Sequence, residues 1–510
     1  MGGETKPGRG IKSWAQRHLN AGFAAGFLLV LLTYLVVSQQ FAATTPNVVT
    51  TKGSRVADKR VIGGAGGDAG LEKKREQEWQ PKVAAAVEEQ ESDKKDTSGA
   101  VPTEESPKRD DADAKPSAEP TDNVVCNTDG PVSETCDLDG DIRINGSALS
   151  VTFVPSIPSE RQEWKIRPYS RRTMAGIEKV TVTQLASPPH DDPAPAPACA
   201  VTHDAPAVLF ALGGLTGNYW HDFSDVLVPL FAASRRYGGD VVFLVSNIQP
   251  WWLGKYEAVV RRLSNHDAVD LDRDATVRCF RRLTVGLRLH KELTIVPELS
   301  PPGGPDGHRV TMADFTAFLR DTYALPRAAP ATPSPERKPR LLLIQRPHYR
   351  RLENVPEVKK AAEAAGFEVT VASPRADAPV GDTARMVNSH DVILGVHGAG
   401  LTNAVFLPPG AVVIQVVPYG KLERMARVDF GEPVADMGLK YLEYGVAAEE
   451  STLLEMLGRE HPVIKDPEAV HRSGWDKVAE WYLGKQDVRI DVDRFAPTLA
   501  QAMEHLRRRR

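Results

Sequence analysis

The stretch Asp391–Pro418 constrains the fold more than any other part of this chain. It reads DVILGVHGAGLTNAVFLPPGAVVIQVVP and contains two apolar runs, Val392–Val396 and Ala411–Val417. Short runs rich in Val and Ile are typical of strands buried on both faces, as in a parallel sheet. The glycines of His397–Gly400 let the backbone turn tightly and approach a ligand. If a helix begins there, its N–H groups form an anion site. We therefore expect a phosphate-bearing ligand, although a Gly-rich turn after a buried strand is also an ordinary structural feature.

Length and composition set broad limits on the protein class. A chain of 510 residues suggests a tail plus two or three domains. Hydrophobic residues make up 41% and charged residues 25% of the chain, which is ordinary for a globular protein. The net charge of −4 lacks the basic excess that nucleic-acid-binding proteins commonly show. We expect no nucleic-acid partner.

The N-terminus predicts a membrane anchor. The uncharged run Ala21–Val37 is about as long as the shortest spanning helices, which take ~17 residues. Before it, Glu4 is opposed by Lys6, Arg9, Lys12 and Arg17. This positive excess places a cytosolic tail at 1–20, an anchor at 21–38 and the remainder across the membrane. A cleaved signal peptide is the alternative, but its apolar region usually spans only ~7–15 residues.

A lumenal location gives meaning to three features that follow the anchor. Residues 39–123 are rich in Lys, Glu, Asp, Pro, Gly and Ser and should form a disordered stem. The four cysteines can form disulfides there, with three possible pairings. Cys126 and Cys136 flank a turn-rich segment and are our first choice for a bridge. Asn145 begins an Asn-Gly-Ser sequon for N-glycosylation.

The remaining chain alternates strand and helix patterns in two halves. In the first half, strand Ala207–Leu212, a helix over 219–235 and strand Val241–Val245 predict a βαβ unit, with Pro229 interrupting the helix. A Pro-rich linker at 325–339 then precedes a second alternating series. We expect an acceptor-side domain at 124–335, a doubly wound α/β domain at 336–485 with its ligand at the strand ends, and a C-terminal tail at 486–510.

Polar residues cluster on one face of the predicted helix in the first half. Asn218, His221, Asp222 and Asp225 recur at spacings of three and four. Acidic residues are favoured in a first helical turn, which explains Asp222 on structural grounds alone. That reason does not explain His221 with Asp225 one turn later. A His–Asp pair can act as a base with an orienting partner.

Basic residues follow the first strand of the second half. Arg346, Arg350 and Arg351 suit phosphate because guanidinium donates bidentate hydrogen bonds and stays charged, although a solvated loop is the alternative. Together with His397 on a neighbouring strand end, they suggest a diphosphate clamp. The run Asp270–Asp274 has carboxylates that can bind Mg²⁺ or Mn²⁺, but we favour a charged loop and expect no metal site.

These motifs resemble plant members of glycosyltransferase family sixty-one, which are Golgi enzymes of the xylan side-chain type. The similarity covers most of the chain from about Cys126 to Tyr482. The matching segments are Cys136–Arg143, Lys165–Tyr169, Gly213–Phe231, Trp251–Ser264 and Gly395–Gly420. Relatives usually carry a Ser-Arg pair after the first strand of the second lobe, where this chain has Gln345-Arg346.

The resemblance implies a type II Golgi membrane enzyme with a lumenal, two-lobed glycosyltransferase-B fold built from two Rossmann-like domains. It implies inverting transfer of arabinofuranose or xylose from a UDP-pentose to xylan, with no cofactor beyond the donor. For such a displacement we expect Asp225 to be the base, with His221 orienting it or serving instead. Asn218 and Asp222 are acceptor-side candidates. The donor-side candidates are Arg346, Arg351, His397, Gly398, Ala399, Gly400 and Asn403.

Three alternatives stay open from the sequence. The chain could be an enzyme similar to the N-glycan β-1,2-xylosyltransferases, which are more distant relatives. It could also be a non-catalytic Golgi partner that supports another glycosyltransferase. A Rossmann-type oxidoreductase ranks last, because we find no GxGxxG after a strand with an acidic residue about 20 positions on.

Overall fold

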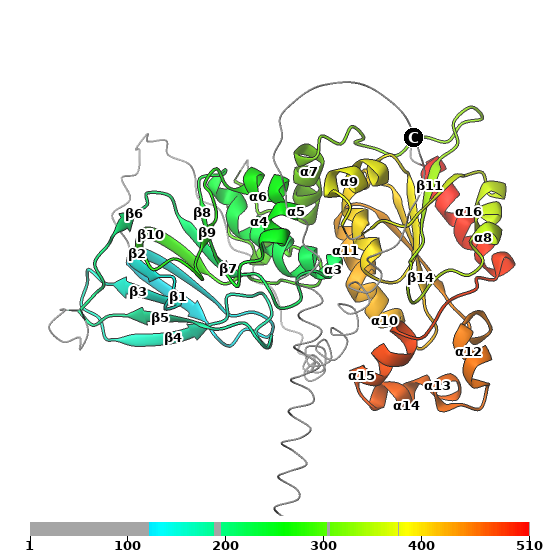
Figure 1. Cartoon of the computed structure of the whole chain (residues 1–510). Coiled ribbons are helices and arrows are strands. Elements are labelled where there is room, and N and C mark those ends of the chain that lie inside the picture. The colour runs from blue at the N-terminus through cyan, green and yellow to red at the C-terminus, as the bar shows by residue number, and fades with distance from the viewer. Residues whose placement is uncertain (1–121, 188–194, 303–306, 376, 509–510) are drawn as a thin grey trace, which may run out of the picture. The chain divides into compact units, whose positions relative to one another are not determined.

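The computed structural model describes residues 122–187, 195–302, 307–375 and 377–508. The expected cytosolic tail, the anchor and nearly all of the stem lie outside these residues, and they stay predictions. Across the described ranges, no helix combines the length and apolarity needed to cross a membrane. The described chain forms two sheets, each with its own helices (Figure 1).

The first sheet has ten strands of mixed direction. Its order is β4-β5-β3-β2-β10-β7-β8-β9, with β1 beside β2 and β6 beside β10. The bounds are β1 Asn123–Asn127, β2 Thr135–Asn145, β3 Ser150–Val154, β4 Gln162–Ile166, β5 Val180–Gln184, β6 Val201–Thr202, β7 Ala207–Ala211, β8 Val242–Ser246, β9 Val269–Asp270 and β10 Val277–Val285.

This sheet differs from the Rossmann-like domain expected for the first half. Strands β7 and β8 are buried throughout and run parallel, as predicted. Strand β2 instead alternates buried and partly exposed residues, which is typical of antiparallel strands with one covered face. Strand β10 joins the two parts, because it pairs antiparallel with β2 and parallel with β7. Its sequence VRCFRRLTV lacks a continuous apolar run, so the segment gave only a weak strand signal.

The second sheet is the doubly wound α/β arrangement predicted from the sequence. Its five strands are all parallel, in the order β12-β11-β13-β14-β15. On β11, Leu341 and Leu343 enter one hydrophobic core, whereas Leu342 and Ile344 enter the other, so helices cover both faces. The bounds are β11 Arg340–Ile344, β12 Glu368–Ala372, β13 Val392–Val396, β14 Val412–Val417, β15 Lys440–Gly445, α8 Val355–Ala364 and α9 Val380–Asn388.

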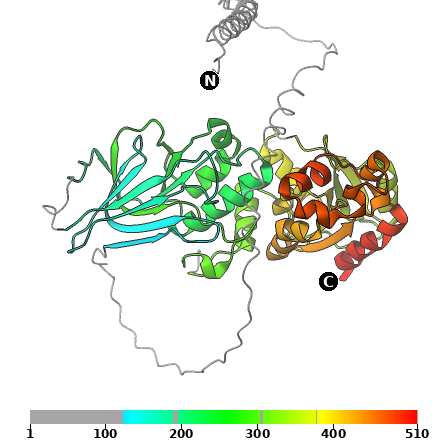
Figure 2. The same cartoon turned by 90° about the horizontal axis from the view of Figure 1, so that it is seen from below.

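The C-terminal segment is a helix rather than the expected tail. Helix α16 (Val492–Arg508) lies beside α8 on one face of the second sheet (Figures 1 and 2). Phe495, Leu499, Ala502 and Leu506 are buried in the core of that face. Their spacing is the apolar stripe of an amphipathic helix, a signal that the terminal arginines obscured.

Aromatic side chains join the two halves. Helix α7 (Met312–Thr322) precedes the linker and belongs to the same hydrophobic core as the turn after β13. The Phe223 ring packs edge-on against Phe315 and Phe406, with centroid distances of 6.4 and 6.1 Å. Burying one such side chain stabilises a fold by roughly 1.5–3 kcal/mol. Separating the halves would therefore expose a shared core.

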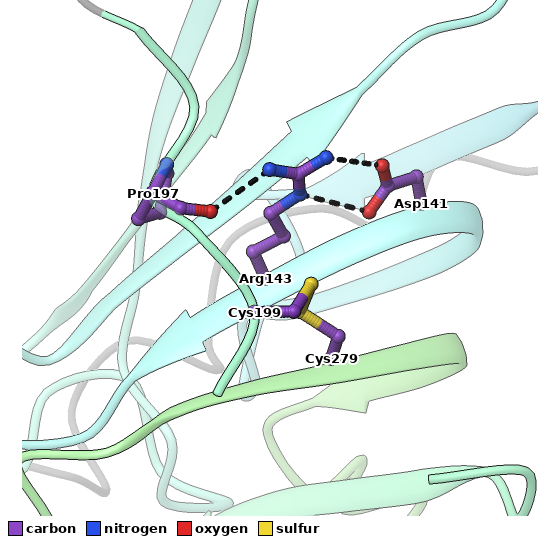
Figure 3. Close-up of a disulfide and its surroundings, with 5 residues drawn as sticks. All are labelled: Asp141, Arg143, Pro197, Cys199 and Cys279. Atoms are coloured by element: carbon purple, nitrogen blue, oxygen red, sulfur yellow. Dashed lines mark hydrogen bonds and ion pairs between the residues drawn. A yellow bond between two sulfur atoms is a disulfide. The ribbon is translucent and has the colours of Figure 1, made fainter. Parts of the chain in front are cut away.

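Two disulfides fasten the first sheet. Cys126 and Cys136 are bonded across directly opposed positions of β1 and β2, which confirms the expected bridge. A second disulfide joins Cys199 to Cys279 of β10. Beside it, Arg143 donates to the carbonyl of Pro197 at 2.8 Å and forms an ion pair with Asp141 at 2.7 Å (Figure 3). The segment before Cys199 is thus held against the sheet at two points.

Candidate active site

The polar patch predicted around His221 lies on the helical segment that follows β7. This segment comprises α3 (Tyr219–His221), the π-helical turn η4 (Asp222–Leu227) and α4 (Val228–Ser234). Pro229 has no N–H to donate to the carbonyl of Asp225 four residues earlier, so the regular helical bonding is broken at this point. A π-helical turn inside a helix is frequent at functional sites.

Asp225 is fully buried, and three side chains donate to or contact its carboxylate. Arg171 forms a bidentate pair with it, from Nη2 to Oδ1 at 2.8 Å and from Nε to Oδ2 at 2.9 Å. The Tyr169 hydroxyl donates to Oδ2 at 2.8 Å. His221 Nδ1 lies 3.0 Å from the same oxygen. Both carboxylate oxygens are therefore occupied.

Electrostatics assign a charge to this group. Burial alone would raise the pKa of Asp225, but Arg171 and His221 outweigh that penalty and the pKa lies below its ordinary value. Asp225 is thus an ionised acceptor at neutral pH. Because a carboxylate can only accept, His221 carries its proton on Nδ1, and acid–base chemistry of the ring falls to Nε2.

Arg171 also holds Glu292, a residue that the sequence did not single out. Its Nη1 and Nη2 donate to the two Glu292 carboxylate oxygens at 2.9 and 2.6 Å. Ser224 of the π-helical turn donates to Glu292 at 3.1 Å. One guanidinium thus binds two carboxylates beside His221.

The acceptor-side candidates Asn218 and Asp222 have structural contacts. The Asn218 side chain caps α3 by accepting from the backbone N–H of Trp220 at 3.0 Å. Asp222 is fully buried and accepts from Trp252 Nε1 at 3.0 Å and from the Tyr256 hydroxyl at 2.8 Å. Burial raises the pKa of Asp222. The Asp222 bonds fix the start of η4 against α5 (Pro250–Lys255) and against Tyr256, which lies between α5 and α6 (Glu257–Leu263).

The glycine-rich turn of the second half brings two arginines together. Gly398 has a φ of +142°, a conformation that residues with a Cβ rarely adopt. A Cβ there would lie 2.7 Å from Arg346 Nη1 and 2.9 Å from Arg350 Nη1. Arg350 Nη1 donates to the carbonyl of His397 at 2.8 Å. The absence of a side chain at Gly398 therefore admits two guanidinium groups to the turn, which suits an anionic ligand.

His397 presents a donor on the same turn. Gln415 Nε2 lies 2.6 Å from His397 Nδ1, and Gln415 Oε1 accepts from the Tyr441 hydroxyl at 2.8 Å. Because Gln415 Oε1 accepts from Tyr441, the Gln415 NH₂ group faces His397 and donates to Nδ1. The proton of the His397 ring therefore lies on Nε2. Burial, followed by the charges of Arg350 and Arg346, holds the pKa of His397 well below its ordinary value. The ring is neutral and donates from Nε2.

The other predicted donor-side residues divide into two groups. Ala399, Gly400 and Asn403 lie in the short 3₁₀ helix η7 (Ala399–Phe406), where Asn403 donates to the carbonyl of Gly400 at 2.9 Å and accepts from Tyr219 at 3.1 Å. Asn403 thus ties the turn to α3. Arg351 lies apart, because its guanidinium Nη2 and Nε both donate to Oδ2 of Asp487, at 2.7 and 2.9 Å. Arg350, its neighbour, reaches the turn instead.

The helical segment of His221 and the glycine-rich turn both contact Asp429, which lies on the π-helical turn η8 (Arg427–Gly431). Trp220 precedes His221, and its Nε1 lies 3.4 Å from the backbone carbonyl oxygen of Asp429. The Asp429 carboxyl lies 3.8 Å from His397 Nε2. The structure thus brings the predicted base side and the predicted phosphate side to one residue. Sequence reasoning missed Tyr169, Arg171, Glu292, Gln415 and Asp429.

Two further expectations concern metal and glycan attachment. Within the described residues, no group of three or more His, Cys, Asp or Glu side chains is arranged to hold a metal ion. In the acidic run after β9, the Asp272 carboxylate accepts from the backbone N–H groups of Asn247 and Ile248. Asn145 ends β2, and its side chain accepts from the Ser147 hydroxyl at 3.1 Å. Metal-independent transfer and glycosylation of Asn145 stay predictions.

Comparison with known proteins shows similarity to glycosyltransferases. The family model described as Glycosyltransferase 61 matches residues 219–414, from α3 into β14. A rice protein, beta-1,2-xylosyltransferase XYXT1, is 43% identical over 76% of this chain and 85% of its own length. Rice alpha-1,3-arabinosyltransferase XAT3 is 40% identical over 75% of this chain and 65% of its own length. Xylan glycosyltransferase MUCI21 of Arabidopsis thaliana is 32% identical over 76% of this chain and 80% of its own length.

Proposed function

The chain belongs to glycosyltransferase family 61, and we propose that it transfers a pentose, xylose or arabinofuranose, from a UDP-sugar to side-chain positions of xylan. The named relatives support this assignment, because they are called xylosyl-, arabinosyl- and xylan glycosyltransferases. The two halves act as acceptor-side and donor-side lobes of a glycosyltransferase-B-type enzyme. It is anchored in the Golgi membrane with both lobes in the lumen.

One observation carries the proposal. The helical segment that carries the His221–Asp225 pair contacts the Asp429 backbone through Trp220, and His397, which lies among arginines, is 3.8 Å from the Asp429 carboxyl. Direct displacement at an anomeric carbon needs a base for the acceptor hydroxyl and positive charge for the leaving diphosphate. In the proposed reaction, the His221–Asp225 pair meets the first need, and His397 with the arginines meets the second.

The geometry favours a changed assignment of the base. The sequence favours Asp225 as the base, but its lowered pKa and its occupied oxygens leave it a weak proton acceptor. We propose that His221 Nε2 removes the proton from the acceptor hydroxyl, while Asp225 orients the ring and stabilises the imidazolium that forms. Arg346, Arg350 and His397 stabilise the leaving UDP without a metal ion.

A transfer assay tests this function. The full chain is offered UDP-xylose or UDP-arabinofuranose together with xylo-oligosaccharides, and the new linkage is read by NMR. We expect transfer from one of the two donors with inverted configuration and undiminished turnover in EDTA. No transfer from either donor would contradict the function. Loss of turnover in EDTA, restored by Mg²⁺ or Mn²⁺, would contradict only the metal-independent mechanism.

A further inference from the structure

Asp429 occupies a position between the two sides of the site that neither the proposed base nor the diphosphate clamp explains. Its backbone carbonyl lies 3.4 Å from Trp220 Nε1, and the Trp220 ring packs edge-on against His221 with centroids 4.8 Å apart. Its carboxyl lies 3.8 Å from His397 Nε2. The backbone of Asp429 is thus fixed on the base side while its side chain reaches the donor side.

The Asp429 carboxyl also lacks hydrogen-bond donors. In the described parts of the chain, no donor lies within hydrogen-bond distance of its oxygens, and its side chain is only 22% exposed. Glu292 differs, because Arg171 and Ser224 occupy both of its oxygens. A partly exposed carboxyl without a donor from the protein is open to a hydrogen bond from a ligand that enters the site.

The surroundings of Asp429 favour a neutral hydroxyl-bearing ligand. Burial, followed by the charge of Glu292, raises the pKa of Asp429 well above its ordinary value. A carboxyl that gains a proton readily repels the neighbouring diphosphate less than a fixed carboxylate would. It can both donate to and accept from hydroxyl groups.

A direct displacement would place the transferred sugar next to Asp429. The reacting carbon of the donor must lie between the acceptor oxygen, near His221, and the leaving oxygen, near His397 and the arginines. We propose that the Asp429 carboxyl binds hydroxyl groups of the transferred sugar and thereby contributes to the choice of pentose. This inference rests on the proposed function and deepens it.

The test compares Asp429→Ala and Asp429→Asn with the wild-type full chain. We expect kcat/KM for the preferred UDP-pentose to fall about 10- to 100-fold in the alanine variant, as for loss of a hydrogen bond to a charged or strongly polar group. UDP itself, measured by calorimetry, should bind within about twofold of wild type, because Asp429 contacts the sugar. The ratio of kcat/KM for UDP-xylose and UDP-arabinofuranose should also change, which a purely structural role would not produce.

Asp436→Ala provides the control. Asp436 ends α11 (Glu432–Asp436), which follows the Asp429 turn directly, and it is exposed. It should leave kcat/KM and the donor ratio near wild type. An unchanged donor ratio in both Asp429 variants, or an equal loss of UDP affinity, would overturn the inference. Failure of the proposed function is separate, because the wild-type chain would then transfer neither pentose.

Discussion

The two histidines of the site differ in the partner that each binds through Nδ1. His221 faces the buried carboxylate of Asp225, which can only accept a hydrogen bond. His397 faces the amide Nε2 of Gln415, which can only donate a hydrogen bond. The two rings therefore adopt opposite tautomers. His221 has its basic nitrogen at Nε2, whereas His397 has its N–H there, so one residue type supplies a base in one half and a donor in the other.

The charges around each ring strengthen this contrast. Beside His221, the carboxylates of Asp225 and Glu292 both bind the one guanidinium of Arg171. Beside His397, the cations Arg346 and Arg350 disfavour a charged ring and favour a bound anion. In the proposed mechanism, these neighbours make His221 the group that activates the acceptor and His397 a group that binds the diphosphate.

Replacing the base should have the largest effect. We expect His221→Gln to lower the turnover of transfer by about 10²- to 10⁴-fold, which is the usual contribution of a general base. UDP affinity should stay within about threefold of wild type. His397→Gln is the matched variant, and it should instead weaken UDP binding. Steady-state kinetics and calorimetry measure the two quantities, and the same loss pattern in both variants would refute the division of roles.

Removing the shared cation should chiefly affect stability. Arg171→Leu leaves Asp225 uncompensated in the core, so we expect the free energy of unfolding to fall by ~3–5 kcal/mol. Arg282→Leu is the control, because the Arg282 side chain is 53% exposed in its pair with Asp139 and should cost less than ~1 kcal/mol. Urea denaturation measures both. Equal losses of unfolding free energy in the two variants would show that the buried Arg171 pair stabilises the fold no more than the exposed Arg282 pair.

The lowered pKa of Asp225 predicts a pH dependence of the same network. Its ionised form contributes stability that is fully present above its ordinary pKa of 3.8 and is lost as the pH falls toward the lower folded-state value. The stability difference between wild type and Asp225→Asn should therefore shrink as the pH falls below about 4. Urea midpoints at a series of pH values test this, and a constant difference would exclude an ionised Asp225.

On the donor side, two neighbouring arginines should behave differently. Arg350→Ala removes a cation from the glycine turn and should weaken UDP binding about 10- to 100-fold, the range for hydrogen bonds to charged groups. Arg351→Ala removes an exposed pair with Asp487 and should change UDP affinity by less than about threefold. Calorimetry measures the affinity of both variants for UDP. A larger loss for Arg351 would mean that the bound state rearranges the loop.

The tautomer of His397 predicts the smallest effect. Gln415→Leu removes the donor to Nδ1 and should weaken UDP binding about 2- to 10-fold, the contribution of one ordinary hydrogen bond. Gln415→Glu should have the larger effect of the two, because a carboxylate would draw the proton to Nδ1 and remove the Nε2 donor. UDP affinity equal to wild type in both variants would show that the tautomer is unimportant.

Much of the second half could be predicted from sequence because its signals are local. The buried strands β11, β13 and β14 are apolar runs, and the turn after β13 carries its own glycines. The centre of the first sheet could not be predicted in this way. Strand β10 has two adjacent arginines, and only its position between β2 and β7 makes it a strand.

The same distinction applies to the site. Helical spacing placed His221 and Asp225 together, since residues four apart share a face. It did not decide which of them is the base, because the deciding contacts come from Tyr169 and Arg171, more than fifty positions earlier. Likewise, two adjacent arginines look alike in sequence. The positive φ of Tyr349 and Arg350, 38° and 53°, accompanies the turn of Arg350 toward His397.

The sequence by itself determined the family, the alternation of strands and helices in the second half, the phosphate-suited turn and the His–Asp pair. These rest on motifs and short periodicities that a linear pattern carries. Only the tertiary structure decided the mixed first sheet, the opposite tautomers of His221 and His397, and the place of Asp429 between them. Those features depend on distant groups brought into a low-dielectric interior, where a single neighbouring donor or charge decides which form of a titratable group is stable.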